Sequence, residues 1–391
     1  MKLTSVQVLN YKLCKDVVIP IDDEMNVLLG KNGAGKTTLL QAIHLLSTNS
    51  ELSLQDTTRT IDTKNYDLTT IIASIFDEED GKTYKFRLRA YFDKDLISNK
   101  PKVSANDFQP TDSKEWIAYN EVDYYFFHLD LRAAANSKQT SKKPNVFFER
   151  MQKIYNFITD MTYVSSTDFL KAKDISPTIQ LGKRGVSNAR SSKINRFLLD
   201  LHQINTVSPK KFNKFKNIVS RVGSGLVDNI ELIDMHLPKS SVQTYRNGIL
   251  TTLEESQEFF VPIFSINNNK LYSNQLSEGT FRSLALIFYI LNHKSNILVI
   301  EEPELSVHLE LLVDIVELMK NSAMEKQIII STHSERIINM LEYKNITIVK
   351  RAENGIEANN LLDKLTEAQL KSFNNYLSDG GELAELLFSE V

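Results

Sequence analysis

The sequence predicts an α/β protein whose parallel core sheet is formed by both ends of the chain. A short apolar run at 26–29 enters a glycine-rich loop, and a segment of helical period follows from residue 37. Between 297 and 350, apolar strand-like runs alternate with helical segments, a pattern typical of parallel sheets with helical crossovers. We therefore expect the N-terminal and C-terminal segments to fold together as one head.

The elements before residue 93 fall into two groups. Apolar strands are expected around 3–8 and 17–21, ahead of the glycine loop. After the first helix, an apolar run at 68–76 meets a turn cluster with Asp80-Gly81, a strong hairpin signal. The return strand at 84–92 alternates apolar with basic or polar residues, so it has one dry face and one wet, basic face. These runs predict an antiparallel β subdomain.

The middle of the chain, to about residue 234, has a mixed and largely helical pattern with polar loops, and no repeat or heptad run. Strands at 232–237 and 259–266 follow. The remaining expected elements are helices at 278–292, 305–320 and 335–341 and strands at 297–300, 328–331 and 346–350. The predicted division is 1–93 and 231–350 for the two parts of the head, 94–230 for a mainly helical insertion, and 351–391 for a tail that contacts a partner.

Composition is that of an ordinary globular protein, with 42% hydrophobic and 24% charged residues. The net charge of −3 excludes a chain that is polybasic throughout. A single cysteine, Cys14, excludes an internal disulfide and favours a reducing, cytoplasmic location. The sequence has no signal-peptide pattern and no apolar run of membrane-spanning length, so we expect no membrane partner.

The glycine-rich loop from Gly30 to Thr37 fits the pattern G-x-x-x-x-G-K-[ST] without deviation. Its glycines let successive backbone N–H groups point at phosphates, and the next helix presents its positive dipole end to the same anion. Lys36 is expected to reach the β- and γ-phosphates of ATP, and Thr37 to bind Mg²⁺. The predicted nucleotide-binding residues are Asn32, Gly33, Ala34, Gly35, Lys36, Thr37 and Thr38.

Paired acids follow the apolar strand at 297–300. Carboxylates at the C-terminal edge of a parallel sheet lie where ligands bind in such folds. We assign Glu301 to the metal ion and Glu302 to the water that attacks the γ-phosphate. The alternative is a solvated helix start, where acids are favoured in any case.

Four further segments carry a family resemblance. Residues 276–280, Leu-Ser-Glu-Gly-Thr, resemble the L-S-G-G-Q signature of ABC-type ATPases, in the form found in the OLD and RecF-like branch. The string from Ile300 to Glu304, with His308 after it, is similar to I-E-E-P-E…L-H-P of that branch. Residues 331–334 resemble its T-H-S switch, and 8–12 its first strand. The resemblance covers about 1–93 and 230–350.

The resemblance implies an ABC-type P-loop head that pairs with a second copy, as a dimer or a higher homo-oligomer, and holds two ATP molecules between the heads. Ser277 and Gly279 would then contact the partner's ATP, and His333 would contact the γ-phosphate. Without the family frame, Ser277 is an ordinary N-cap and His333 a structural histidine.

This sequence also departs from the branch. Glu301 replaces the commoner Asp, Glu278 replaces the first signature glycine, and Leu309 replaces a proline. We do not place a Q-loop glutamine, because the available glutamines lack flanking support and a segment at 162–166 occupies the expected region. These glutamines are Gln152, Gln180 and Gln203.

The segment from Lys171 to Arg221 is a basic stripe, with twelve Lys or Arg and two acids, a local charge of +10. It could hold nucleic-acid phosphates, meet an acidic protein partner, or form a solvated surface. Aromatic residues are sparse in it, so base stacking is not strongly indicated.

The family has members that end in a TOPRIM nuclease, which needs a Glu and an Asp-x-Asp. After His333 we find no such pattern, and we expect no nuclease activity in this chain. The resemblance implies the sensor and regulator ATPase of a bacterial anti-phage defence system that controls a separate toxic effector, with DNA or a phage protein as trigger. The alternative is a RecF/SMC-like DNA-binding ATPase of repair or recombination. The long insertion and the Glu-Glu-Pro-Glu string disfavour a transporter subunit.

Overall fold

The computed structural model describes residues 1–47, 69–91, 102–110, 116–118, 146–165, 167–169, 176–181, 193–220, 223–238, 242–246, 249–253, 256–292, 295–353 and 355–390. The chain divides into two compact units. Unit 1 consists of Met1–Val164, Lys294–Pro303 and Met319–Val391, and unit 2 of Ser165–His293 and Glu304–Leu318. The predicted α/β class, with a mixed sheet, an antiparallel subdomain and helices, is confirmed.

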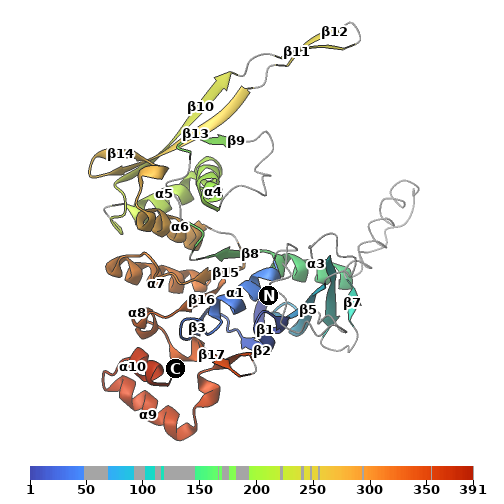
Figure 1. The fold of residues 1–391 in the computed structure, drawn as a ribbon, viewed down its shortest axis with the longest axis vertical. Coiled ribbons are helices and arrows are strands. Elements are labelled where there is room, and N and C mark those ends of the chain that lie inside the picture. Colours follow the sequence, from blue (N-terminus) through green and yellow to red (C-terminus); the bar gives the residue numbers. More distant parts are fainter. Residues whose placement is uncertain are drawn as a thin grey trace, which may run out of the picture. The chain divides into compact units, whose positions relative to one another are not determined.

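A six-stranded mixed sheet forms the core of unit 1, in the order β18-β17-β3-β16-β15-β8. All neighbours in it are parallel except the pair at the β18 edge. Its strands are β3 (Met25–Leu29), β8 (Met161–Val164), β15 (Ile297–Glu301), β16 (Gln327–Thr332), β17 (Ile346–Ala352) and β18 (Gly355–Asn360). Figure 1 shows the blue strand β3 between β16 and β17 from the other end of the chain, so both ends of the chain form one core sheet, as the sequence predicts.

The antiparallel sheet of unit 1 has the order β2-β1-β4-β5-β6-β7. Its strands are β1 (Lys2–Tyr11), β2 (Cys14–Pro20), β4 (Thr69–Asp77), β5 (Lys82–Tyr91), β6 (Lys102–Pro110) and β7 (Ile117–Ala118). The predicted hairpin is β4–β5, in which Asp77 pairs with Lys82 across the turn. Tyr84, Phe86 and Leu88 are buried while Lys85 is exposed, so the dry and wet faces follow the period-two pattern.

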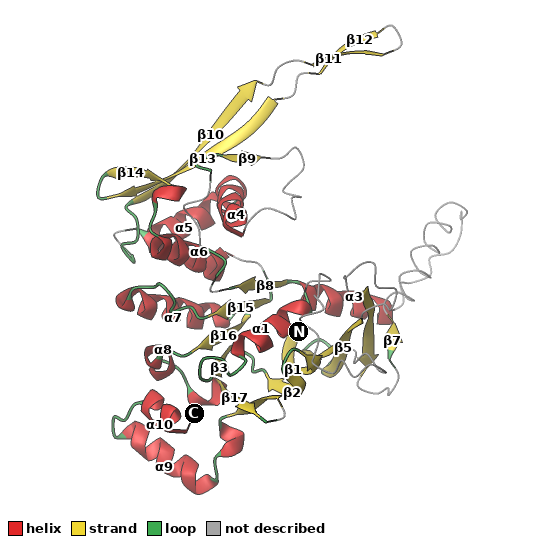
Figure 2. Ribbon diagram, viewed as in Figure 1, coloured by secondary structure: helices red, strands yellow, loops and turns green. Residues whose placement is uncertain are grey.

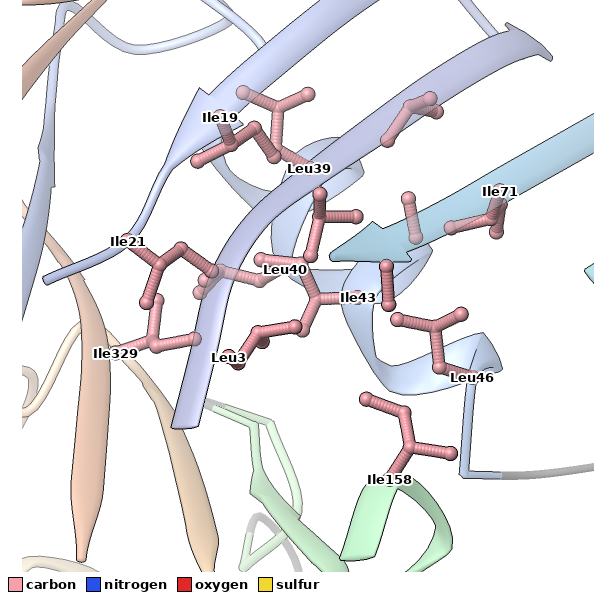
Figure 3. Close-up of a cluster of buried hydrophobic side chains, with 14 of the residues drawn as sticks. Leu3, Ile19, Ile21, Leu39, Leu40, Ile43, Leu46, Ile71, Ile158 and Ile329 are labelled. Atoms are coloured by element: carbon pink, nitrogen blue, oxygen red, sulfur yellow. The ribbon is translucent and has the colours of Figure 1, made fainter. Parts of the chain in front are cut away.

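Helix α1 (Lys36–Leu45) contacts strands of both sheets, namely β1 of the antiparallel sheet and β8, β15 and β16 of the mixed sheet (Figure 2). Leu39, Leu40 and Ile43 of this helix are fully buried. Figure 3 shows them among apolar side chains from β1, β4, β16 and α3 (Val146–Thr159). Because α1 begins at the glycine loop, this core fixes the position of the loop against the ends of the strands.

Cys14 belongs to the same core and is fully buried. Burial raises the pKa of its thiol to about 12, so the thiol is not ionised at neutral pH. Among the described residues, no helix has both the length and the apolar character needed to cross a membrane.

Unit 2 combines an antiparallel sheet with helices. Its strands are β9 (Ile179–Leu181), β10 (Asn229–Pro238), β13 (Ser256–Ile266) and β14 (Asn269–Tyr272), together with the separate pair β11 (Val242–Arg246) and β12 (Ile249–Leu253). Its helices include α4 (Lys193–Val207), α5 (Pro209–Val219), α6 (Glu278–Asn292) and the part of α7 (Leu309–Ala323) up to Leu318. The ring of Phe197 lies 5.3 Å from that of Phe281 and 5.4 Å from that of Phe288, so an aromatic core joins α4 to α6.

Three differences from the sequence expectations have physical causes. The segment 94–230 contains α3, α4 and α5 but also strands, among them β8 in the core sheet, because short strands carry too few residues to show a period. The helix expected at 305–320 is α7 (Leu309–Ala323), since Ser306 has a φ of +61°, which a helix excludes. Residues 231–292 belong to unit 2, whereas the sequence division assigns them to the head.

The residues after the core sheet form two helices, α9 (Glu367–Ser378) and α10 (Leu383–Glu390). Helix α10 contacts α8 (Glu335–Asn339), which follows β16. The side chain of Asn339 joins them, because its Oδ1 accepts a 2.7 Å bond from the Ala384 N–H and its Nδ2 donates a 2.7 Å bond to Glu382.

Candidate nucleotide-binding site

The glycine loop connects β3 to α1, and its shape depends on residues without a side chain. Gly33 and Gly35 have φ values of +77° and +111°, in the region that other residues rarely adopt. A Cβ on Gly30 would lie 2.3 Å from the carbonyl oxygen of Val349, so close packing against β17 requires glycine there as well. The loop backbone therefore curls as the sequence motif predicts.

Lys36 is the first residue of α1 and is only 5% exposed. Its ammonium group donates to the carbonyl oxygens of Gly30, at 2.7 Å, and Lys31, at 3.2 Å. The side chain thus lies back across the loop, with its charge beside the backbone that precedes the helix. Asn32 and Gly33 are exposed, Ala34 is buried, and Thr38 is half-buried. An anion at this helix start would meet the free N–H groups and the ammonium group together.

Thr37 and Glu301 meet although 264 residues separate them in the chain. The hydroxyl of Thr37 donates a 2.5 Å hydrogen bond to Oε1 of Glu301, the last residue of β15. Glu301 is 6% exposed, and its other oxygen, Oε2, accepts a 3.0 Å bond from the hydroxyl of Tyr163. A buried carboxylate requires such partners.

The oxygen donors of Thr37 and Glu301 fit a magnesium ion, which prefers hard oxygen ligands. Across the described part of the chain, no group of three or more His, Cys, Asp or Glu side chains could hold a metal ion. An ion between Thr37 and Glu301 would therefore take its other ligands from phosphate and water, as Mg²⁺ does at phosphate-binding sites.

Glu302 follows β15 in an unusual backbone conformation, with a φ of +43°. Its N–H is held by Ser331 of the neighbouring strand β16, at 3.0 Å from the carbonyl oxygen and 3.3 Å from the hydroxyl. A non-glycine residue with positive φ stores strain, and such strain clusters at functional sites. Glu302 is half-buried, so the carboxylate remains accessible to water.

His333 lies beside Glu302, with 3.7 Å between its Nδ1 and Oε1 of Glu302. It comes directly after β16, and its side chain is 43% exposed. The structure therefore brings Lys36, Thr37, Glu301, Glu302 and His333 to one edge of the mixed sheet. This convergence follows from the parallel register, because the carboxyl ends of parallel strands meet at the same edge.

Ser277 and Gly279 lie in unit 2, at the start of α6. Ser277 is exposed, and its hydroxyl oxygen accepts a 3.1 Å bond from the N–H of Thr280, which is an N-cap arrangement. A Cβ on Gly279 would lie 2.6 Å from the carbonyl oxygen of Ser306, so the close approach of these two backbone segments requires a glycine at this position. Ser277 thus acts as an N-cap, as its position predicts, and its hydroxyl remains at the surface.

Two residues of the site were not identified by sequence reasoning, Tyr163 and Ser331. Tyr163 lies within the segment noted at 162–166, but no sequence motif marks a tyrosine that contacts a carboxylate. The feature that reveals its role is the pairing of its strand, β8, with β15, which ends at Glu301. The glutamines considered for a Q-loop lie on α3 (Gln152), β9 (Gln180) and α4 (Gln203). Gln152 donates instead to Asn156 in its own helix.

A P-loop with a lysine and a threonine, in contact with the first of two acids at the end of one parallel strand, defines a nucleotide-binding site of the P-loop ATPase class. The AAA ATPase domain family matches residues 1–338, which is most of the chain. The chain therefore belongs to that family.

Comparisons with other proteins show which ATPases this chain resembles. A 47-residue segment is 40% identical to the DNA replication and repair protein RecF of Clostridioides difficile (strain 630), and covers 12% of this chain and 13% of that protein. A crystal structure of an Smc head bound to the C-winged helix domain of ScpA superposes with a TM-score of 0.53 at 16% identity, over 93% of this chain and all of that one.

An Smc head domain with an extended coiled coil, bound to the C-terminal domain of ScpA derived from Pyrococcus furiosus, gives a TM-score of 0.50 at 14% identity, over 96% of this chain and 98% of that one. At such identities these structures establish the fold alone. The family match, the RecF segment and this fold together support an ABC-type ATPase that is similar to RecF and to SMC heads.

Proposed function

We propose that this protein binds ATP with Mg²⁺ and hydrolyses it, in composite sites between two paired heads. The observation that carries the proposal is the contact between Thr37 and Glu301 beside Lys36 and Glu302. Lys36 would hold the β- and γ-phosphates, and the N–H groups of residues 32–38 would hold the α- and β-phosphates. Thr37 and Glu301 would bind the metal ion, which neutralises charge that develops on the phosphates.

Glu302 is the proposed general base. Its carboxylate lies beside His333 at the sheet edge, directly after the Glu301 that contacts Thr37, and its backbone is fixed by Ser331. A base held in this way would orient and deprotonate the attacking water with little reorganisation. His333 would contact the γ-phosphate and respond to its loss, and its proximity to Glu302 supports this role.

The second half of each site would come from another copy of the chain. Ser277 is exposed at a helix start, where a hydroxyl and free N–H groups suit an anion. A twofold pair of heads would bring Ser277 and Gly279 of each copy to the ATP of the other. The product would be a dimer that forms with ATP and separates after hydrolysis, or a higher homo-oligomer built from such pairs.

Mixing two inactive variants tests the composite site. Lys36→Ala removes the phosphate contact, and Ser277→Asp places a carboxylate against the partner's γ-phosphate. A mixed dimer has one site in which both halves are intact. We therefore expect an equimolar mixture to recover about a quarter of wild-type ATPase activity, since half of the randomly formed dimers are mixed and each has one working site of two.

The matched control is a mixture of Lys36→Ala with Glu302→Gln. Both changes lie on the P-loop side of the site, so a mixed dimer contains no intact site and no activity should return. Equal recovery in the two mixtures, or none in the first, would contradict the proposed composite site.

At a finer level, we assign this ATPase to a bacterial anti-phage defence system, as the sensor and regulator of a separate effector, a nuclease in particular. The family resemblance of the signature and switch segments supports the proposal. The tail helices α9 and α10 are the proposed effector contact. The ATP-bound state, locked by Glu302→Gln, should co-purify the effector from infected cells. Purification without any partner, in infected and uninfected cells alike, would count against this role.

A RecF/SMC-like DNA-binding ATPase is the second candidate, and helix α5 favours it. Lys210, Lys211 and Lys214 are exposed, while Phe212 and Phe215 on the other face are buried. No acid occurs between Leu201 and Val227. Six basic residues of the stripe lie outside the described residues, namely Lys171, Lys173, Lys183, Arg184, Arg190 and Arg221.

Charge reversal tests this candidate. If the three exposed lysines of α5 each contact a phosphate, changing them to glutamate should weaken DNA binding and lower the slope of log K against log salt by about 2.7. The ATPase rate without DNA should not change. Unaltered DNA affinity and salt slope would remove α5 from consideration as a nucleic-acid surface.

A further inference from the structure

Four side chains from three elements contact one another in series beside the proposed metal site. On helix α1, Thr37 donates to one oxygen of Glu301 at 2.5 Å. The other oxygen of Glu301 accepts a 3.0 Å bond from the Tyr163 hydroxyl. The ring of Tyr163 stacks on that of His44, with 4.8 Å between centroids and 19° between planes, and His44 lies on α1 again.

The fold explains why these residues meet. Tyr163 pairs with Val299 in the parallel register of β8 and β15, and Val299 and Glu301 face the same side of the sheet because side chains alternate along a strand. Glu301 is thus a diagonal neighbour of Tyr163, within reach of a long aromatic side chain. Thr37 and His44 are seven residues apart, about two helical turns, so both face the sheet from α1.

We infer that Tyr163 is a positioning residue for the metal-binding carboxylate of Glu301. Tyr163 lies on β8, the strand beside β15, in the region where the family resemblance leads us to expect a glutamine. Its phenol hydroxyl would affect the metal ion indirectly, by orienting the Glu301 carboxylate. A donor fixed on Oε2 prevents rotation of the carboxylate and leaves Oε1 on the Thr37 side. Stacking on His44 holds the phenol ring in turn.

This inference rests on the proposed function, because it assigns a role to Tyr163 only if Glu301 and Thr37 hold Mg²⁺. Outer contacts that orient metal ligands commonly contribute 10- to 100-fold to metal affinity. Tyr163 does not contact the nucleotide in this scheme, so its hydroxyl should affect nucleotide affinity only when the metal ion is present.

The test is a magnesium titration of nucleotide binding with Tyr163→Phe, which removes the hydroxyl and keeps the ring on His44. A fluorescent, slowly hydrolysed ATP analogue is bound in EDTA and then at rising Mg²⁺ concentrations. We expect the affinity in EDTA to be unchanged and the Mg²⁺ midpoint to rise by about tenfold. Tyr84→Phe is the matched control, since Tyr84 makes a comparable 2.6 Å bond to Asp80 at the hairpin turn, and its midpoint should equal that of the wild type.

A second pair of variants examines the stacking. His44→Ala removes the ring beneath Tyr163 and should raise the midpoint by a smaller factor, whereas His44→Phe retains an aromatic face and should not. If the wild-type chain gains no affinity from Mg²⁺, the proposed metal site itself is wrong. If the wild type gains affinity and Tyr163→Phe follows the same curve, the positioning role of Tyr163 is wrong while the metal site stands.

Discussion

The proposed ATP chemistry draws on two regions that are built in different ways. At the sheet edge of unit 1, Thr37, Glu301 and Tyr163 are bonded to one another although they are distant in sequence. At the start of α6 in unit 2, the exposed Ser277 bonds within its own helical turn, through its hydroxyl to Thr280 and through its carbonyl oxygen to the N–H of Phe281. The first region is preorganised by long-range contacts, and the second presents a locally capped helix start at the surface.

This difference has a physical origin. Parallel strands deliver their carboxyl ends to one edge, so the core that aligns the strands also aligns the side chains that follow them. A helix start needs only its own cap to expose N–H groups. The sheet edge should therefore govern nucleotide binding and the chemical step within one copy, and the signature segment should govern what happens between copies.

Lys36→Ala should have the largest effect on the first region. The buried ammonium group supplies the charge that meets the phosphates, and truncation of one partner of a buried charged pair costs about 2–5 kcal/mol, or about 30-fold to several thousand-fold in affinity. Isothermal titration with Mg²⁺-ATP should show no measurable binding at micromolar protein. A dissociation constant within threefold of wild type would mean that Lys36 does not contact the nucleotide.

Glu302→Gln should have the next largest effect, on catalysis and not on binding. Loss of a general base costs about 10²- to 10⁴-fold in rate, while the amide keeps the volume and the φ of residue 302. The variant should retain ATP and accumulate as a dimer. Single-turnover hydrolysis and size-exclusion chromatography with light scattering measure both outcomes, and normal turnover would reassign the base.

Ser277→Asp addresses the second region. Aspartate caps helices about as well as serine, so the thermal midpoint of unfolding should remain close to that of the wild type. The added carboxylate should oppose the partner's γ-phosphate and lower ATP-dependent dimer affinity by about tenfold or more. Ser277→Ala is the converse control, since it loses the cap and about 1 kcal/mol of stability. If Ser277→Asp dimerises normally with ATP, Ser277 is only a cap.

Five residues that the sequence singles out, Lys36, Thr37, Glu301, Glu302 and His333, lie at one sheet edge, while their roles remain predictions. The glycine loop needs particular residue types at fixed spacing, so Gly33, Gly35 and Lys36 can be identified without a structure. The hairpin alternation at β5 was visible because ten residues repeat one period. Strand β8 has four residues and no repeat, so its place beside β15, and with it the role of Tyr163, could not be predicted.

Ser331 was missed for a different reason. It is fully buried in β16, and its contact with the Glu302 N–H depends on a positive φ that no sequence pattern specifies for glutamate. The sequence predicts that Glu302 lies at the C-terminal edge of the sheet, but it gives no signal that Ser331 contacts the Glu302 backbone. Backbone strain of this kind is visible only once the strands are paired.

Ser331→Ala should have the smallest effect, and it tests how far preorganisation of the sheet edge matters. The change removes the hydroxyl acceptor at 3.3 Å and leaves the carbonyl acceptor at 3.0 Å, so Glu302 should be held less firmly without being released. We expect kcat to fall by about two- to fivefold, the equivalent of about 0.5–1 kcal/mol, with KM unchanged.

Ser295→Ala is the matched control for Ser331→Ala. Ser295 is also buried, just ahead of β15 at the opposite end of that strand from Glu302, and its hydroxyl donates a 3.1 Å bond to Thr162. Both variants lose one buried hydroxyl bond, so both should lose about 1 kcal/mol of stability. Only Ser331→Ala should lower kcat, because only Ser331 touches the backbone of the proposed base. Equal rates in the two variants would show that the carbonyl bond alone fixes Glu302.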